Sequence, residues 1–202
     1  MDIVQQAAAY VRGVYPASDW PHIVEVVTYA RQLATETGAD QEIVDLAAYF
    51  HDIATATMGP EEHDIKSAEL ARQWLRERGY EAERVERVAA AIMAHMRPVM
   101  GPARESVPLE GRILYDADKL GRAQGFHLLR ALVRLGAQVA WAELSYERLA
   151  DAIREGRAAT QDAYRTLYTD AAREMARLGY EQVLAFSDHI LQMQVFQVPP
   201  AD

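Results

Sequence analysis

Residues 46–54 read Leu-Ala-Ala-Tyr-Phe-His-Asp-Ile-Ala, an apolar run in which His51 and Asp52 stand side by side. The apolar spacing predicts a buried helix over residues 41 to about 53. Burying an imidazole and a carboxylate costs several kcal/mol unless they are paired or bind a metal. Adjacent helical side chains point about 100° apart, so both can share a metal only if the helix ends or loosens here. Taken alone, the pair favours a structural interpretation, in which the histidine is hydrogen-bonded at a helix end and the aspartate is solvated.

Apolar residues in the rest of the chain also recur at intervals of three and four, which predicts an all-α protein. Ser18-Asp19-Trp20-Pro21 is a typical helix start, and Gly38 is a typical helix end. The other predicted helices span residues 2–14, 63–79, 82–96 and 109–135, with a short helix from Ser145 and two stretches within 158–195 separated by Gly179. The segments 54–62 and 97–108 are expected to be loops, the second a possible lid over a nearby site.

The composition limits the classes of protein that this chain can represent. Its 202 residues, half of them hydrophobic, suit one domain over 1–202, with the site-bearing part at about 18–135 and helices at 140–196 completing the bundle. A net charge of -9 argues against binding of a nucleic-acid polymer, and the lack of cysteine excludes disulfides and thiolate zinc sites. We find no secretory signal and no apolar run of about 18 residues, so a cytoplasmic protein without a membrane partner is expected. The sequence leaves the oligomeric state open.

Two further positions supply side chains of the same kind as the His51-Asp52 pair. His22 lies in the first turn of the second predicted helix, and Asp118 lies within the run Asp-Ala-Asp-Lys-Leu at 116–120. Imidazole nitrogens and carboxylate oxygens are ligands for zinc, manganese, iron, nickel or cobalt. The four residues come from three separate helices, and each one alone is explained better by a structural role.

The order of these residues resembles the HD-domain superfamily of metal-dependent phosphohydrolases. A histidine, then His-Asp at the end of an apolar helix, then an aspartate before lysine occur in the order of that family. The resemblance covers about residues 18–135, and its matching pieces are Pro21–Val26, Leu46–Ile53, His63–Ala68, Ile92–His95 and Asp116–Leu120. It implies an all-α, single-domain helical bundle of the HD-domain type.

The resemblance also implies a site and an activity. His22, His51, Asp52 and Asp118 would hold a divalent metal (Mn, Fe, Ni, Co, Zn or Mg), as one ion or two. A metal-activated water would then cleave a phosphate ester or anhydride of a small phosphorylated molecule, with nucleotides among the candidates. Asp52 or Asp118 would accept the proton of that water. The run Gly-Phe-His-Leu-Leu-Arg at 125–130 departs from one nucleotide-hydrolysing branch of the family, which leaves the nucleotide assignment open.

His63 and His95 have two functional interpretations under this resemblance. They line the site as phosphate contacts or proton donors to the leaving group, or they hold a second metal. We expect a single ion with both histidines lining the site, and packing in the core is the structural alternative. Lys119 would neutralise substrate phosphate or developing charge.

The remaining candidates are Asp116, Arg97 and Arg130. Asp116 would orient a metal-bound imidazole without binding the metal itself, or else it is a capping or solvated carboxylate. Arg97 and Arg130 would contact the substrate anion, although each is explained equally by a surface position.

Two other functions are compatible with the same residues. A di-iron oxygenase would use the extra histidines His63 and His95 for a second iron. A ligand-binding regulatory module would keep the pocket without turnover, but such a module is expected to have lost a ligand, and all four are present here.

Overall fold

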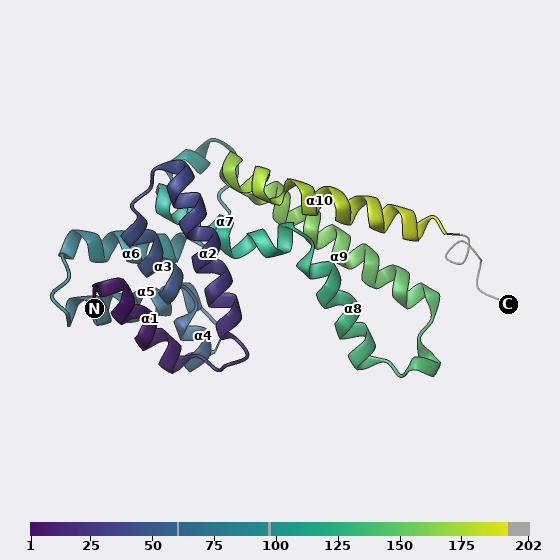
Figure 1. Cartoon of the computed structure of the whole chain (residues 1–202), viewed down its shortest axis with the longest axis horizontal. Helices are drawn as coiled ribbons and strands as arrows, with labels where there is room; N and C mark the ends of the chain where they lie inside the picture. The colour runs from purple at the N-terminus through teal and green to yellow at the C-terminus, as the bar shows by residue number, and fades with distance from the viewer. Residues whose placement is uncertain (60, 97, 194–202) are drawn as a thin grey trace. The chain divides into compact units, whose positions relative to one another are not determined.

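The computed structural model describes residues 1–59, 61–96 and 98–193, and every regular element within them is a helix (Figure 1). The predicted fold class, all-α, is therefore confirmed. The elements are, in chain order, α1 (Ile3–Val14), α2 (Trp20–Thr37), α3 (Gln41–Phe50), α4 (Ile53–Met58), α5 (His63–Arg76), α6 (Ala82–Ala94), η1 (Gly101–Ser106), α7 (Leu109–Ala123), α8 (Phe126–Gln138), η2 (Trp141–Glu143), α9 (Tyr146–Thr166) and α10 (Asp170–Leu191).

The structure differs from the sequence prediction at several helices. The predicted helix 109–135 is divided into α7 and α8, and the short helix predicted from Ser145 continues to Thr166 as α9. Residues 54–58 were expected to belong to a loop but lie in α4, whose first turn is secured when buried Ser67 accepts a hydrogen bond from the Ala54 amide at 3.1 Å. Gly179 was expected to separate two helices, yet α10 runs through it. A side chain at Gly179 would meet the backbone of Gln124 at 3.0 Å, so this glycine permits close packing and does not end the helix.

The chain divides into two compact units, which we describe separately. The first comprises Met1–Asp118 with Tyr168–Ala172, and the second comprises Lys119–Leu167 with Arg173–Asp202. The prediction of one domain over 1–202 stays a prediction.

Helix α3 is the centre of the first unit, where it packs against α1, α2, α5 and α6 (Figure 1). Its side chains Ile43, Leu46 and Phe50 are fully buried. The apolar run that opened the sequence is thus the core of this unit, and His51 and Asp52 stand at the end of its central helix.

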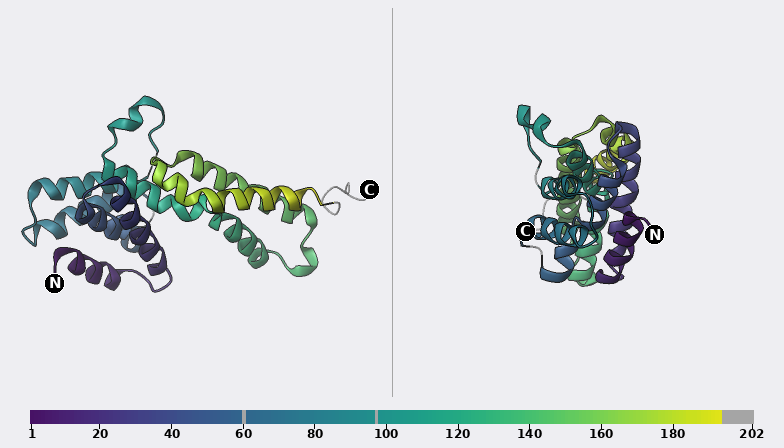
Figure 2. Two further views of the ribbon diagram at one scale, coloured as in Figure 1. Left: turned by 45° about the horizontal axis from the view of Figure 1, so that its top comes forward. Right: turned by 90° about the vertical axis from the view of Figure 1, so that its left-hand side faces the viewer.

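In the second unit, α8 packs along α9, and α9 lies beside α10 (Figure 2). A side chain at Gly156 of α9 would meet the Cα of Leu128 at 2.5 Å, which accounts for glycine at this crossing. The rings of Tyr164 and Tyr180 stack with centroids 4.0 Å apart and join α9 to α10.

No helix within the described residues is long and apolar enough to cross a membrane.

Gly111 fixes how closely α7, which carries Asp118, approaches the end of α6. A Cβ at Gly111 would lie 2.7 Å from the Cβ of Ala94. We therefore expect Gly111→Ala to lower the free energy of unfolding by roughly 1–2 kcal/mol, because the overlap outweighs the better helix propensity of alanine. Gly136 of α8 is the matched control, since its Cβ would meet nothing within 4 Å. Gly136→Ala should stabilise by about 0.5–1 kcal/mol in the same urea titration, and equal effects at both glycines would contradict the packing argument.

Candidate metal centre

His51 and Asp52 lie at a break between two helices. Helix α3 ends at Phe50 and α4 begins at Ile53, and Asp52 has φ -115° and ψ 12°, outside the helical region. This break meets the condition under which two adjacent side chains can face one site. The His51 side chain is fully buried, whereas the Asp52 side chain is one-quarter exposed.

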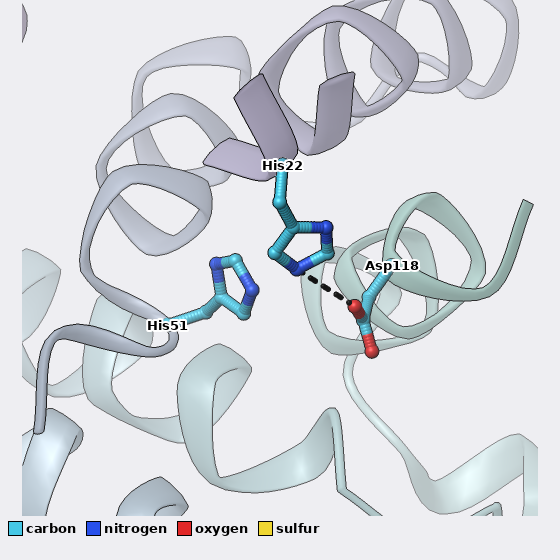
Figure 3. Close-up of side chains that lie close together, drawn as sticks. All are labelled: His22, His51 and Asp118. Carbon is cyan, nitrogen blue, oxygen red and sulfur yellow. Dashed lines mark ion pairs between the residues drawn. The ribbon is translucent and has the colours of Figure 1, made fainter. Parts of the chain in front are cut away.

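His22, His51 and Asp118 form the first group of possible metal ligands (Figure 3). They project toward one another from the first turn of α2, the end of α3 and the middle of α7, and one ligand atom of each lies within 4.8 Å of the others. The Nε2 of His22 lies 3.3 Å from an Asp118 carboxylate oxygen, and the rings of His22 and His51 are 5.4 Å apart. The structure thus brings together three residues that are separated by 29 and 67 positions in the chain.

Asp52, His63 and His95 form a second group of the same kind. His63 is the first residue of α5, and His95 follows the last residue of α6. The Asp52 Oδ1 lies 3.2 Å from Nε2 of His63 and 3.5 Å from Nε2 of His95. All four histidines of the predicted set therefore meet at the end of α3.

The Asp52 carboxylate lies between the two groups. Its Oδ2 is 3.6 Å from Nε2 of His51 and 3.9 Å from Nε2 of His22. Its Oδ1 faces His63 and His95 at the distances given above. Each oxygen of one carboxylate thus faces a different pair of imidazoles.

The hydrogen bonds of the two buried imidazoles suit metal ligation. The Nδ1 of His51 lies 2.8 Å from the Ala48 carbonyl, and the Nδ1 of His95 is bonded to the Ile92 carbonyl. A carbonyl only accepts, so Nδ1 carries the proton and Nε2 presents its lone pair to the site. The Nε2 of His51 and Oδ1 of Asp52 are buried without a hydrogen-bond partner in the described structure. A buried polar atom without a partner lowers the stability of the fold, and a bound cation would interact favourably with both atoms.

The electrostatics of the group lead to the same conclusion. Burial lowers the pKa of His51, so this imidazole is neutral. Burial alone would raise the pKa of Asp52, but the neighbouring imidazoles of His51 and His95 outweigh it and hold that pKa well below its usual range. The hydrogen bond with Asp118 raises the pKa of His22. An ionised carboxylate beside a neutral imidazole is the protonation state in which both can bind a metal.

Asp116 makes its hydrogen bonds away from the histidines. Its buried carboxylate accepts from the backbone amides of Tyr168 at 2.6 Å and Thr169 at 2.8 Å, and from the Thr169 hydroxyl at 2.7 Å. These contacts hold residues 168–169 against α7, two residues before Asp118. The hydrogen bonds in the structure thus give Asp116 a structural role. No hydrogen bond in the described structure joins Asp116 to an imidazole, so its predicted role in orienting one stays a prediction.

The segment 98–108, which contains η1, projects from the ends of α6 and α7 (Figure 2, left). Tyr168 holds it: the Val99 amide donates to the Tyr168 hydroxyl at 2.5 Å, and the Arg104 guanidinium lies 4.3 Å from the centre of the Tyr168 ring. The action of this segment as a lid stays a prediction. Arg97 lies outside the described residues, so its predicted substrate contact has no structural description.

Lys119 and Arg130 belong to the second unit. Lys119 is partly buried on α7, and Arg130 is exposed on α8. Their predicted contacts with the substrate stay predictions.

Two residues near the metal-ligating side chains were not singled out from the sequence. Ser67 ties α5, which carries His63, to the first turn of α4 through the Ala54 amide. Tyr15 is buried, its hydroxyl has no partner in the described structure, and burial together with the charge of Asp52 raises the pKa of that hydroxyl. Nothing in the local spacing of the sequence distinguishes them from ordinary helix or core residues.

The fold and the two ligand groups define an all-α protein with a histidine–aspartate metal centre. A family model described as HD domain matches residues 20–123, more than half of the 202 residues. The chain therefore belongs to the HD domain family, and the predicted resemblance is confirmed. A search of curated proteins gives no significant match.

Solved structures with a similar fold carry related descriptions. An HD-superfamily hydrolase from Bacillus thuringiensis matches with a TM-score of 0.69 at 20% identity, over 94% of this chain and 95% of that chain. A predicted HD superfamily hydrolase from an uncultured Thermotogales bacterium matches with a TM-score of 0.58 at 26% identity, over 93% and 90%. Bacillus subtilis YpgQ in complex with ADP matches with a TM-score of 0.68 at 23% identity, over 98% and 95%. Membership of the family and the two ligand groups together support a metal-dependent hydrolase.

Proposed function

We propose that this protein is a metal-dependent phosphohydrolase that cleaves a phosphate ester or anhydride of a small molecule. The observation that carries the proposal is the position of Asp52, whose two oxygens face two separate groups of ligands. Paired sites of this kind suit in-line displacement at phosphorus, because both the attacking and the leaving oxygen need charge stabilisation. The complex of YpgQ with ADP makes nucleotides one class of substrate to test.

The ligand sets would support two ions. His22, His51 and Asp118 would hold one, His63 and His95 would hold the other, and Asp52 would contribute one oxygen to each. Divalent ions bound here would lower the pKa of a water molecule and polarise the phosphoryl oxygens. The sequence favoured one ion with His63 and His95 lining the site, and we now favour two because those histidines face the same carboxylate as His51.

The residues of the chain have separate tasks in this proposal. The backbone carbonyls of Ala48 and Ile92 fix the tautomers of His51 and His95 and so aim both Nε2 atoms at the site. Asp118 lies next to His22, whose side chain is 42% exposed, and Asp52 is one-quarter exposed, so either carboxylate would accept the proton of an attacking water. Lys119 would offset phosphate charge.

The two groups of ligands are also compatible with a second function, that of a di-iron oxygenase. Paired iron sites in helical proteins use similar histidines and carboxylates. Two irons per chain, with oxygen consumption and no release of phosphate from any substrate, would favour this function over hydrolysis.

The test combines metal content with turnover. Purified protein is loaded separately with Mn, Fe, Co, Ni, Zn or Mg, analysed for metal per chain, and assayed for phosphate release on a panel of nucleotides and phosphate monoesters. We expect about two ions per chain and phosphate release with at least one metal. His22→Ala and His63→Ala, which alter one group each, should each bind about one ion and lose roughly 10²–10³-fold in kcat.

Glu69→Gln, an exposed position on the same helix as His63, is the matched control and should behave as the wild type. Unchanged turnover in His22→Ala and in His63→Ala would contradict the proposal. One ion in the wild type, retained by His63→Ala, would contradict the two-ion arrangement.

A further inference from the structure

Tyr15 is a buried tyrosine whose hydroxyl has no hydrogen-bond partner in the described structure. The residue is 8% exposed, and its hydroxyl oxygen is fully buried. The hydroxyl of a buried tyrosine usually has a partner, because an unpaired buried donor lowers the stability of the fold. Phenylalanine would fill the same space without that loss, so packing alone does not account for a tyrosine at this position.

The fold places Tyr15 near the helix break that carries Asp52. Tyr15 follows the last residue of α1, and its amide donates to the Val11 carbonyl at 3.1 Å, which fixes its backbone. Helix α1 packs against both α3 and α4, and Asp52 stands between those two helices (Figure 1). The ring of Tyr10 on α1 lies 6.1 Å from the ring of Phe50 at the end of α3. These contacts place α1 next to the break between α3 and α4.

Electrostatics identify the charged group that acts most strongly on the Tyr15 hydroxyl. Burial raises the pKa of this hydroxyl, the charge of Asp52 raises it further, and Asp19 has a smaller effect in the same direction. Asp19 is exposed and already accepts a hydrogen bond from the Ser18 hydroxyl at 2.9 Å. The Tyr15 hydroxyl therefore keeps its proton at neutral pH and can donate it in a hydrogen bond, and Asp52 is the nearby carboxylate that needs such a donor.

The Asp52 carboxylate can accept a hydrogen bond even while it binds metal. Its Oδ1 is buried without a hydrogen-bond partner in the described structure. Each carboxylate oxygen has two lone pairs, so an oxygen that binds an ion with one of them can still accept a hydrogen bond with the other. Carboxylates that bind metals are themselves held by hydrogen bonds from neighbouring groups, and these bonds orient them. An unpaired donor and an unpaired acceptor thus lie close enough to interact electrostatically.

We propose that Tyr15 is a positioning residue of the metal centre and donates a hydrogen bond to the Asp52 carboxylate when that carboxylate binds metal. The hydroxyl and the carboxylate must approach each other for this bond to form, since no hydrogen bond joins them in the described structure. The bond would fix the direction of a carboxylate whose two oxygens face two groups of ligands. The inference rests on the ion binding in the proposed function, but not on the reaction that the ions would support.

The first test compares Tyr15→Phe with the wild type in metal affinity and in stability. The dissociation constant for Mn or Zn, from titration of chelator-treated protein, should rise about 10–100-fold in Tyr15→Phe. The midpoint of urea unfolding without metal should be unchanged or higher, because the substitution removes an unpaired buried hydroxyl. Tyr10→Phe, on the same helix at a residue that is 41% exposed, should match the wild type in both measurements. Asp19→Asn should likewise keep the metal affinity of the wild type.

The second test detects the hydrogen bond itself. The protein is labelled with ¹³C at the Cζ atoms of its tyrosines, and NMR spectra are recorded during titration with Zn or Mg, which are diamagnetic. The signal that is missing in Tyr15→Phe should move as the ions bind, because the Cζ atom responds to the hydrogen bonding of its hydroxyl. The same signal should stay in place in Asp52→Asn, and the signal of Tyr10 should stay in place in both proteins.

The outcomes separate this inference from the proposed function. A Tyr15→Phe protein with the metal affinity of the wild type, or a Tyr15 signal that does not move on loading, would overturn the inference and leave the hydrolase proposal intact. A lower unfolding midpoint in metal-free Tyr15→Phe would also overturn it, because the hydroxyl would then have a partner without metal. Weakened metal binding and a moving signal, in a protein that releases phosphate from no substrate, would support the inference and contradict the hydrolase proposal. A wild type that binds no divalent ion would overturn both.

Discussion

Replacing Asp52 by asparagine is expected to reduce turnover by about 10³-fold or more and to leave the protein with no more than one ion per chain. The amide has one oxygen, so it can serve one of the two groups that the carboxylate faces at 3.2–3.9 Å, and its nitrogen points a donor at the other. The loss of about 4 kcal/mol of transition-state stabilisation that this implies is within the range attributed to metal-assisted phosphoryl chemistry.

The measurement pairs kcat with metal analysis on the same preparation. Asp64→Asn is an informative comparison, because Asp64 also lies near His63 but outside both ligand groups. It should retain two ions and a kcat close to that of the wild type. An Asp52→Asn protein with two ions and the turnover of the wild type would show that this carboxylate does not join the two groups.

Much of the first unit could be predicted from the sequence because its signals are local. The apolar run at 46–54 identified the core helix, and the pairing of His51 with Asp52 at its end required a break, which the structure has between Phe50 and Ile53. The residues that meet at this break were predicted from their order along the chain, since the resemblance covers residues 18–135. Their division into two groups could not be predicted, because it depends on which oxygen of Asp52 each ring faces.

Other features escaped prediction because they depend on contacts between distant segments. Gly179 was expected to end a helix, but it serves close packing against Gln124, 55 residues earlier. The hydroxyl of Tyr15 is buried without a hydrogen-bond partner in the described structure, which becomes visible only when the helices are packed. Asp116 and Asp118 are two residues apart in one motif, yet their carboxylates bind different parts of the protein. A pattern identifies residue types and spacing, whereas partners are set by packing.

Asp116→Ala is expected to lower the free energy of unfolding of the metal-free protein by about 3 kcal/mol or more. The substitution leaves three donors, the amides of Tyr168 and Thr169 and the Thr169 hydroxyl, without the acceptor they share in a buried position. An unsatisfied buried donor costs about 1–3 kcal/mol. Asp116→Asn should be milder, because it keeps one acceptor oxygen. Burial also raises the pKa of Asp116 to about 6, against the hydrogen bonds from Tyr168 and Thr169, so the neutral amide avoids a desolvation cost that the carboxylate carries.

The comparison that decides between the two roles of Asp116 is with Asp118→Asn, two residues further along α7. Asp118 contacts partly exposed His22, so Asp118→Asn should change the free energy of unfolding of the metal-free protein by less than about 1 kcal/mol. The same substitution should weaken metal binding. Urea titrations of the metal-free variants and metal titrations of the folded ones give both quantities. If Asp116→Asn instead weakened metal binding about 10–100-fold and left stability unchanged, Asp116 would act as an orienting residue of the metal centre. Because its three hydrogen bonds all go to residues 168–169, we expect the effect on stability to be the larger one.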